Sequence, residues 1–187
     1  MLFEIGLVTA NILSFLGNIT FTSSSVFKKK ELILLLQSIA HILSSIAEII
    51  TKAYCGLVQE VSSLLRDIVL VFVKEDKRML KIAISIVFVV IGSIVAIVLN
   101  IILKQNNWYD YAPVLATILY TVFLVISEFK GENGIVYLKV GLILNSIGWI
   151  IYTLFYKLYP PTIFNSITIV SSIITIFKYS IDKKREV

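Results

Sequence analysis

Long apolar stretches separated by short polar connections run through the whole of this 187-residue chain. A transmembrane helix needs about 20 mainly apolar residues, and seven stretches come close to that length. The third is the least regular, because Glu60, Arg66 and Asp67 interrupt it. No connection is long enough to form a soluble domain, so we expect the function to lie in the membrane bundle or in short loops. The predicted spans are residues 5–26, 32–50, 57–73, 82–103, 111–127, 135–156 and 162–179.

The composition supports an integral membrane protein. Hydrophobic residues make up 58% of the chain, and the mean hydropathy of +0.92 exceeds that of a soluble domain of this size. The net charge of +5 is better explained by membrane topology than by nucleic-acid binding, which needs a basic, base-stacking surface. We therefore expect an all-α integral membrane protein that contacts the lipid bilayer and binds no nucleic acid.

Basic residues are distributed unequally between the two predicted sides of the membrane. Alternating the seven spans places 13 Lys and Arg residues on one side and 3 on the other, with Arg66 inside a span. Cytoplasmic loops are enriched in Lys and Arg, so the pattern predicts an external N-terminus and a cytoplasmic C-terminus. The minority side carries Lys52, Lys104 and Lys157. The majority side carries Lys28, Lys29, Lys30, Lys74, Lys77, Arg78, Lys81, Lys130, Lys139, Lys178, Lys183, Lys184 and Arg185.

Two segments of the chain resemble each other and indicate a duplication. Residues 36–42 (LQSIAHI) recur 108 positions later as residues 144–150 (LNSIGWI), and a Val-Ser-Ser sequence follows each of them. The repeat predicts two parallel three-helix bundles joined by one inverting helix, because three is an odd number of spans. The predicted organisation is 3+1+3: a first bundle at residues 1–79, a linker helix at 80–106, and a second bundle with a basic tail at 107–187.

Related halves of a membrane protein usually enclose a site near the bilayer midplane, and rocking one half against the other gives alternating access. The leading hypothesis is therefore a transporter of a small polar solute. The repeat pairs polar or aromatic residues that could line such a site, since amides and hydroxyls bind hydroxylated ligands and a Trp ring stacks on sugars. The alternative is that these side chains hydrogen-bond between helices. The candidate pairs are Gln37 with Asn145, His41 with Trp149, and Ser63 with Ser172.

Residues 111–114 (YAPV), 149–152 (WIIY) and 63–66 (SLLR) add local support to a family resemblance that covers nearly the whole chain. By topology and repeat the chain resembles the SWEET, SemiSWEET and PQ-loop superfamily, and within it the bacterial YgjV-like inner-membrane proteins. The resemblance implies facilitated transport of a small polar solute, typically a sugar in the SWEET branch, and a bacterial inner-membrane location. Two features depart from the superfamily pattern: the Pro-Gln pair is absent, and Ser63 and Ser172 replace the third-helix Asn.

Arg66 and Asp67 lie deep in the third predicted span. Adjacent helical residues point in different directions, so we expect other helices to supply partners for this pair. A structural ion-pair network and a proton-coupling role are both open for the pair, with Asp67 the first candidate for proton coupling and His41 a further proton acceptor. Glu48 and Glu60 lie near the outer ends of their spans, and we expect them to be hydrated interfacial charges.

No motif indicates catalysis or a cofactor. Cys55 is the only cysteine, so no intramolecular disulfide forms, and no metal-ligand spacing or phosphate-binding loop is present. We therefore expect neither an enzyme nor a bound metal or cofactor. The main alternative to a transporter is a membrane-embedded interaction or regulatory subunit, with a lipid-processing enzyme third. A homo-oligomer is compatible with the sequence but is not required, because one chain contains both halves.

Overall fold

The protein is all-helical in the computed structural model, which describes residues 2–24, 30–73, 77–104, 107–130 and 133–185. Each predicted span corresponds to a helix of its own, including the third with its charged residues; positions 25 and 26 of the first span lie outside the described residues. The elements are α1 (Leu2–Ser24), α2 (Lys30–Thr51), α3 (Tyr54–Val71), α4 (Arg78–Ile102), the 3₁₀ helix η1 (Trp108–Tyr111), α5 (Ala112–Phe129), α6 (Gly134–Phe155) and α7 (Tyr159–Arg185).

Exposure along the helices is that of a protein surrounded by lipid. On α4 the side chains of Ile91 and Ile94 are more than half exposed, whereas Ser93 and Asn100 are buried. Apolar groups are stable against lipid, while polar groups are costly there unless they face the protein interior. Among the described residues, five helical segments are long and apolar enough to cross a membrane: α1, α4, η1 with α5, α6 and α7. The described apolar part of α2 is shorter, and α3 carries charged residues.

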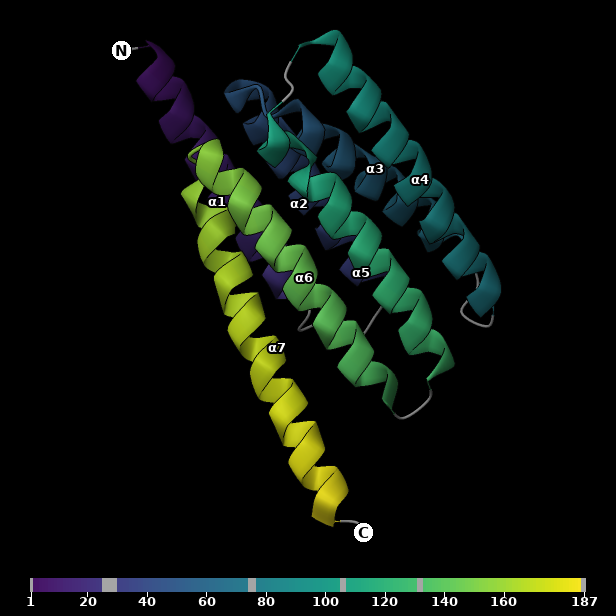
Figure 1. The fold of residues 1–187 in the computed structure, drawn as a ribbon. Coiled ribbons are helices and arrows are strands. Elements are labelled where there is room, and N and C mark those ends of the chain that lie inside the picture. Colours follow the sequence, from purple (N-terminus) through teal and green to yellow (C-terminus); the bar gives the residue numbers. More distant parts are fainter. Residues whose placement is uncertain (1, 25–29, 74–76, 105–106, 131–132, 186–187) are drawn as a thin grey trace.

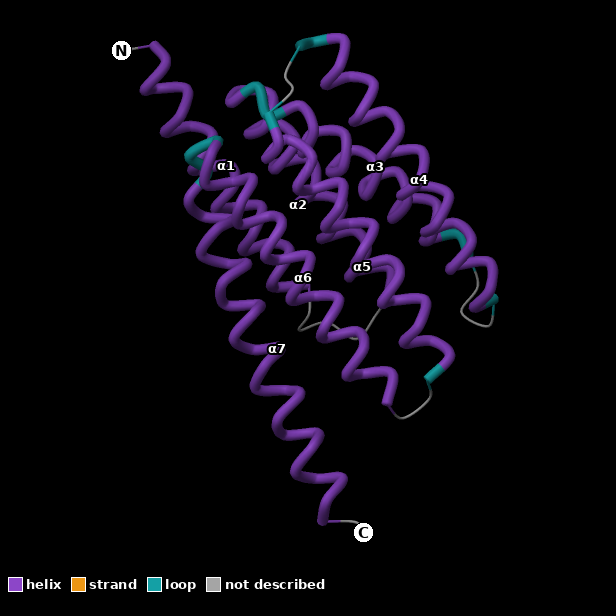
Figure 2. The backbone as a smooth tube through the Cα atoms, in the orientation of Figure 1, coloured by secondary structure: helices purple, strands orange, loops and turns teal. Residues whose placement is uncertain are grey.

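Successive helices run in opposite directions, so their connections gather at two ends of the bundle (Figure 1). One end, here called the turn end, holds the N-terminus and the connections after α2, α4 and α6. The opposite end, here called the basic end, holds the connections after α1, α3 and α5 and the C-terminus. The tube in Figure 2 shows the same alternation. Lys77, Arg78 and Lys130 lie at the basic end, whereas Lys28, Lys29 and Lys74 lie outside the described residues.

Two turns at the turn end have the same structure. After α2 the Ala53 N–H donates to the Glu48 carbonyl at 2.8 Å, and after α6 the Leu158 N–H donates to the Thr153 carbonyl at 2.9 Å. Each bond spans five residues, and the residue just before its donor has a left-handed conformation. This is the Schellman pattern, which satisfies the last carbonyls of a helix. Such positive φ angles also follow α4; they occur at Lys52 (58°), Lys104 (54°) and Lys157 (57°).

The helices pack mainly against their neighbours in sequence. α2 contacts both α1 and α3, α6 contacts both α5 and α7, and α4 packs chiefly on α3. The helices α1–α3 meet the helices α5–α7 through α1 with α7 and α3 with α5. Each helix of α1–α4 packs on the next, as does each helix of α5–α7, and α4 lies at one edge of the bundle (Figure 1). For description, α1–α3 and α5–α7 are called the two sets of helices.

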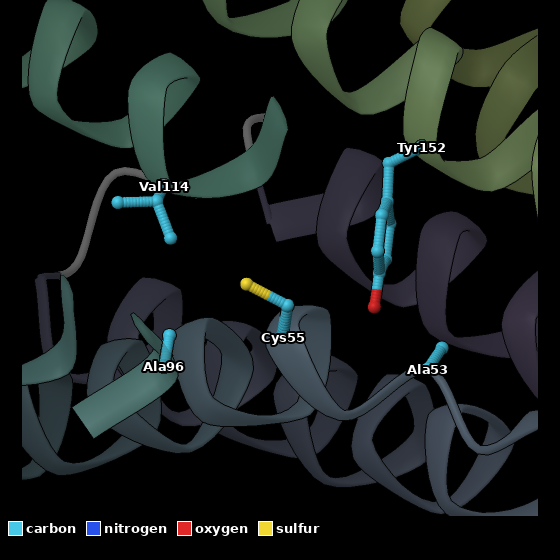
Figure 3. Close-up of a cluster of buried hydrophobic side chains, with 5 residues drawn as sticks. All are labelled: Ala53, Cys55, Ala96, Val114 and Tyr152. Carbon is cyan, nitrogen blue, oxygen red and sulfur yellow. The ribbon is translucent and has the colours of Figure 1, made fainter. Parts of the chain in front are cut away.

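Most of the buried apolar side chains form two clusters, and both clusters lie at the turn end. The first joins the start of α3 to α4, α5 and α6, and Figure 3 shows Tyr152 reaching from α6 toward it. The second joins α1 and α2 to the α6–α7 turn. The two sets of helices are thus held together at this end. The clusters consist of Ala53, Cys55, Ala96, Val114 and Tyr152, and of Ala10, Ala47 and Leu158.

Candidate functional site

The His41 ring lies between two carboxylates of α3. His41 Nδ1 and Glu60 Oε2 are 2.5 Å apart and share a hydrogen bond, whose donor depends on where the proton sits. On the other side of the ring, His41 Nε2 and Asp67 Oδ2 make a 3.4 Å ion-pair contact. Glu60 and Asp67 are seven residues apart on α3, which is two helical turns, or about 10.5 Å. One ring from α2 therefore bridges two acids on one face of α3.

Arg66 pairs with its neighbour Asp67. Its Nε atom donates to Asp67 Oδ1 at 3.0 Å, and its Nη2 atom forms an ion pair with the same oxygen at 2.9 Å. The sequence predicts partners from other helices, and α2 supplies His41 for Asp67. Arg66 and Asp67 also bind each other, although adjacent helical positions point in different directions. The long arginine side chain bends back far enough to reach the adjacent carboxylate. Oδ1 of Asp67 thus binds Arg66, and the other carboxylate oxygen, the buried Oδ2, lies next to His41.

The four side chains form a nearly enclosed charged cluster in the α2–α3 interface. Their exposed side-chain fractions are 11% for His41, 16% for Glu60, 2% for Asp67 and 23% for Arg66. Two carboxylates and one guanidinium leave the cluster with one negative charge when His41 is neutral. A proton on His41 makes it neutral overall, which lowers the cost of holding charges away from water.

The other candidate residues from the sequence are not joined to this cluster by any hydrogen bond of the described residues. Gln37 and Ser63 are half-buried. Asn145 is also half-buried, on α6. The Trp149 ring meets Tyr152 edge-on, with centroids 5.9 Å apart, and packs on the first apolar cluster. Ser172 is fully buried and its hydroxyl has no hydrogen-bond partner.

The matching turns give a second way to superimpose α2 on α6. They pair Glu48 with Thr153 as carbonyl acceptors, an offset of 105 residues, whereas the sequence repeat has an offset of 108. In the register of the turns Ala47 pairs with Tyr152, and both are fully buried. His41 then pairs with Ser146, whereas the sequence repeat pairs it with Trp149. The two registers differ by three residues, nearly one helical turn, and the pairing of the candidate residues stays a prediction.

Sequence reasoning missed two acids of the α2–α3 interface. Glu60 binds His41, and Glu48 is only 3% exposed, so the expectation of hydrated interfacial charges is wrong. The signal that could have found them is helical spacing. Glu48 lies seven residues after His41, and Glu60 lies seven residues before Asp67, so each pair lies on one helix face.

Glu48 lies against the first turn of α3 and the last turn of α6. The Gly56 N–H, in the first turn of α3, donates to Tyr152 Oη at 2.7 Å. A Cβ atom on Gly56 would overlap both the Glu48 carboxylate and the Tyr152 ring, so these three residues are in close contact. The first N–H groups of a helix have no partner within the helix and favour a nearby anion. Glu48 lies beside this first turn of α3, and its Oε2 atom has no hydrogen-bond partner among the described residues.

Further polar contacts also lie at the turn end. The Asn11 amide of α1 donates to the Lys157 carbonyl and accepts from the Tyr159 N–H, both at 3.0 Å, so it clamps the α6–α7 turn. The Tyr156 hydroxyl donates to Asp110 at 2.6 Å. Burial, followed by this bond to Asp110, raises the pKa of Tyr156, which lies in the turn beyond α6. It therefore stays a protonated donor at neutral pH.

A family comparison agrees with this membrane architecture. The sequence model of the Imp-YgjV family, described as bacterial inner membrane protein, matches residues 8–183. No curated protein and no solved structure matches the chain. The family match extends from α1 into α7 and covers most of the chain. The chain therefore belongs to the Imp-YgjV family of bacterial inner membrane proteins, with several membrane-spanning helices.

Proposed function

We propose that the protein is a transporter that carries a small polar solute by alternating access. In this proposal α1–α3 and α5–α7 are the two related halves, corresponding to residues 1–79 and 107–187, and α4 is the helix that makes them parallel. All seven helices span the membrane. The turn end faces outside, and the basic end faces the cytoplasm.

The observation that supports the proposal is the joining of the two halves at the turn end. Both apolar clusters, the Gly56–Tyr152 hydrogen bond and the Asn11 clamp lie at the turn end. Alternating access requires halves that separate at one end while they touch at the other. A bundle closed at its turn end corresponds to one of those two states.

Polar side chains deeper in the bundle provide the proposed solute site. Asn145 and Gln37 are half-buried and make no hydrogen bond with another described residue, so their amides are available to a ligand. Ser63 is half-buried as well. Such groups suit a hydroxylated, uncharged solute such as a sugar, with Trp149 as a stacking surface. A relation of this chain to the SWEET and PQ-loop superfamily is part of what we propose.

Uptake into proteoliposomes tests the proposal. The wild-type protein is given a panel of labelled monosaccharides, disaccharides and amino acids, beside the Asn145→Ala and Trp149→Phe variants. The matched control is Asn165→Ala, because that amide is bonded to the Pro161 carbonyl of its own helix at 2.9 Å. We expect saturable uptake that Asn145→Ala abolishes and Asn165→Ala retains. Absence of uptake by folded protein for every solute would contradict a transporter.

The second candidate is a membrane-embedded interaction subunit. A groove of about 460 Å³ runs along α7, and it is almost wholly apolar. Such a face could receive a helix of another membrane protein. This function predicts a stable partner and no uptake. The groove is lined by Thr162, Ile163, Ser166, Ile167, Val170, Ser171 and Ile174.

A further inference from the structure

Four titratable side chains follow one another through the α2–α3 interface. The two helices are antiparallel and are joined by the turn at Lys52. The number of residues along each helix from that turn therefore measures how far a side chain lies below the turn end. Counted this way, the order is Glu48, Glu60, His41 and Asp67, at 4, 8, 11 and 15 residues. At about 1.5 Å per residue, the line extends from about 6 Å to about 22 Å below the turn.

The histidine is hydrogen-bonded to Glu60 and in ion-pair contact with Asp67, and the second contact must shorten to a hydrogen bond for a proton to pass. The Nδ1 atom lies 2.5 Å from Glu60 Oε2, and the Nε2 atom lies 3.4 Å from Asp67 Oδ2. Imidazole can accept a proton on one nitrogen and release one from the other. Series of Asp, Glu and His inside a membrane mark proton relays.

We propose that Glu60, His41 and Asp67 form a proton relay, with Glu48 as the acid nearest the turn end. In the inward step the Glu60 O–H bond breaks and an Nδ1–H bond forms, which leaves a Glu60 carboxylate and a protonated ring. The Nε2–H bond then breaks and an O–H bond forms at Asp67 Oδ2. Asp67 is left neutral, and the ring keeps its Nδ1 proton. Reversal of the two steps returns the proton to Glu60.

Charged groups surround the His41 ring, so a change in the charge of the ring alters its interactions with them. From α3 the ring faces Glu60 and Asp67, and Asp67 is itself bound by Arg66. From α1 the described side chain against the ring is Phe21, which meets it edge-on at 5.9 Å. From α5, Tyr120 is close enough to interact electrostatically with Arg66 and Asp67. A proton on Asp67 would leave Arg66 without its counter-charge.

This inference rests on the proposed function for the coupling of a proton to a solute. The relay itself can be tested without a solute, because His41 is the only histidine in the chain. Protein labelled with ¹⁵N-histidine and purified without a histidine tag gives NMR signals from one ring alone. The measurement is made in lipid bilayers, from about pH 5 to about pH 9, the range in which histidine usually changes charge.

The expected result is a ring that exchanges between protonated and neutral forms within this range, with hydrogen bonds at both nitrogens. Glu60→Gln should shift the Nδ1 signal chiefly, and Asp67→Asn the Nε2 signal chiefly. Asn165→Ala should change neither. A ring that keeps one neutral tautomer throughout, or that responds to neither variant, would overturn the relay. If Asp67→Asn fails to fold, Glu60→Gln still tests the relay through the Nδ1 signal, because this variant leaves the Arg66–Asp67 pair in place.

Solute uptake separates the failure of the relay from the failure of the transporter. A His41 ring that titrates between both acids in a protein without uptake contradicts the transporter and supports the relay. If a solute is taken up, His41→Gln should abolish the dependence of uptake on an imposed pH gradient. Gradient-dependent uptake that survives His41→Gln would overturn the coupling and leave the transporter standing.

Discussion

Tyr152 of α6 accepts a hydrogen bond from the backbone N–H of Gly56 on α3, and both residues are buried. The bond connects the first set of three helices with the second at the turn end, and it satisfies an N–H that has no partner within its own helix. Opening of the bundle at this end would have to break it. The contact therefore gives a direct way to test how the two halves are held together.

Replacing Tyr152 by Phe should destabilise the protein by about 1 to 3 kcal/mol, the usual cost of leaving a buried donor without a partner. The ring remains, so the loss reports the hydrogen bond rather than packing. The measurement is the free energy of unfolding in detergent micelles. The control is Tyr137→Phe, since that ring stacks on Lys130 and its hydroxyl makes no described hydrogen bond. Equal stability of the two variants would show that the Gly56–Tyr152 bond contributes little.

Gly56→Ala should destabilise the protein by about 1 to 3 kcal/mol, as expected for overpacking. Its Cβ would overlap the Glu48 carboxylate and the Tyr152 ring. The same change at Gly6 meets only Ile50 at 3.4 Å, an ordinary contact, so Gly6→Ala should be neutral or slightly stabilising. Thermal unfolding of both variants in the same detergent measures the difference. A lower midpoint for Gly6→Ala than for Gly56→Ala would contradict this packing.

Asp67→Asn should cost about 3 to 5 kcal/mol, because it leaves Arg66 without its counter-charge in a largely buried position. Replacing both residues, as Arg66→Met with Asp67→Leu, should cost less than Asp67→Asn alone, since no unpaired charge remains. Unfolding of the three proteins by denaturant in mixed micelles gives the comparison. If the double variant is the least stable, the ion pair contributes more to stability than its desolvation costs.

Cys55 should report the opening of the turn end, because it is the only cysteine in the chain and is 1% exposed. We expect slow reaction of Cys55 with a water-soluble maleimide in the wild-type protein. Asn11→Ala removes the two hydrogen bonds that clamp the α6–α7 turn and should speed the reaction several-fold, at a cost of about 1 to 3 kcal/mol in stability. Mass spectrometry of the labelled protein follows the rate.

The control for this labelling is a Cys55→Ser protein with Glu4→Cys, an exposed position on α1. Its rate should be the same with and without Asn11→Ala. Rapid labelling of Cys55 in the wild-type protein would mean that the turn end opens readily despite the clamp.

The sequence was enough to predict seven helices close to their actual limits. The reason is that a span must be mainly apolar over its full length to be stable in lipid, and such stretches can be recognised directly in the sequence. Even the third helix, interrupted by Glu60, Arg66 and Asp67, was predicted with an error of a few residues. The side of the membrane to which each end belongs stays a prediction from the count of basic residues.

The candidate site was predicted only in part. His41 and Asp67 were identified as unusual because a titratable group within a span is conspicuous. The position of Glu60 near the end of its span predicts a hydrated charge, whereas its partner on α2 is visible only in the structure. The two halves and the register of the repeat stay predictions, because registers that differ by nearly one helical turn place each residue on a similar helix face.

The sequence by itself determined the membrane class, the number of helices and the alternation of their directions, because these depend on local hydrophobicity and on length. Only the tertiary structure decided which polar groups meet. The His41 contacts with Glu60 and Asp67, and the Gly56–Tyr152 bond, depend on how antiparallel helices are rotated and aligned against one another. That alignment is fixed by packing at the turn end, where residues far apart in the sequence come into contact.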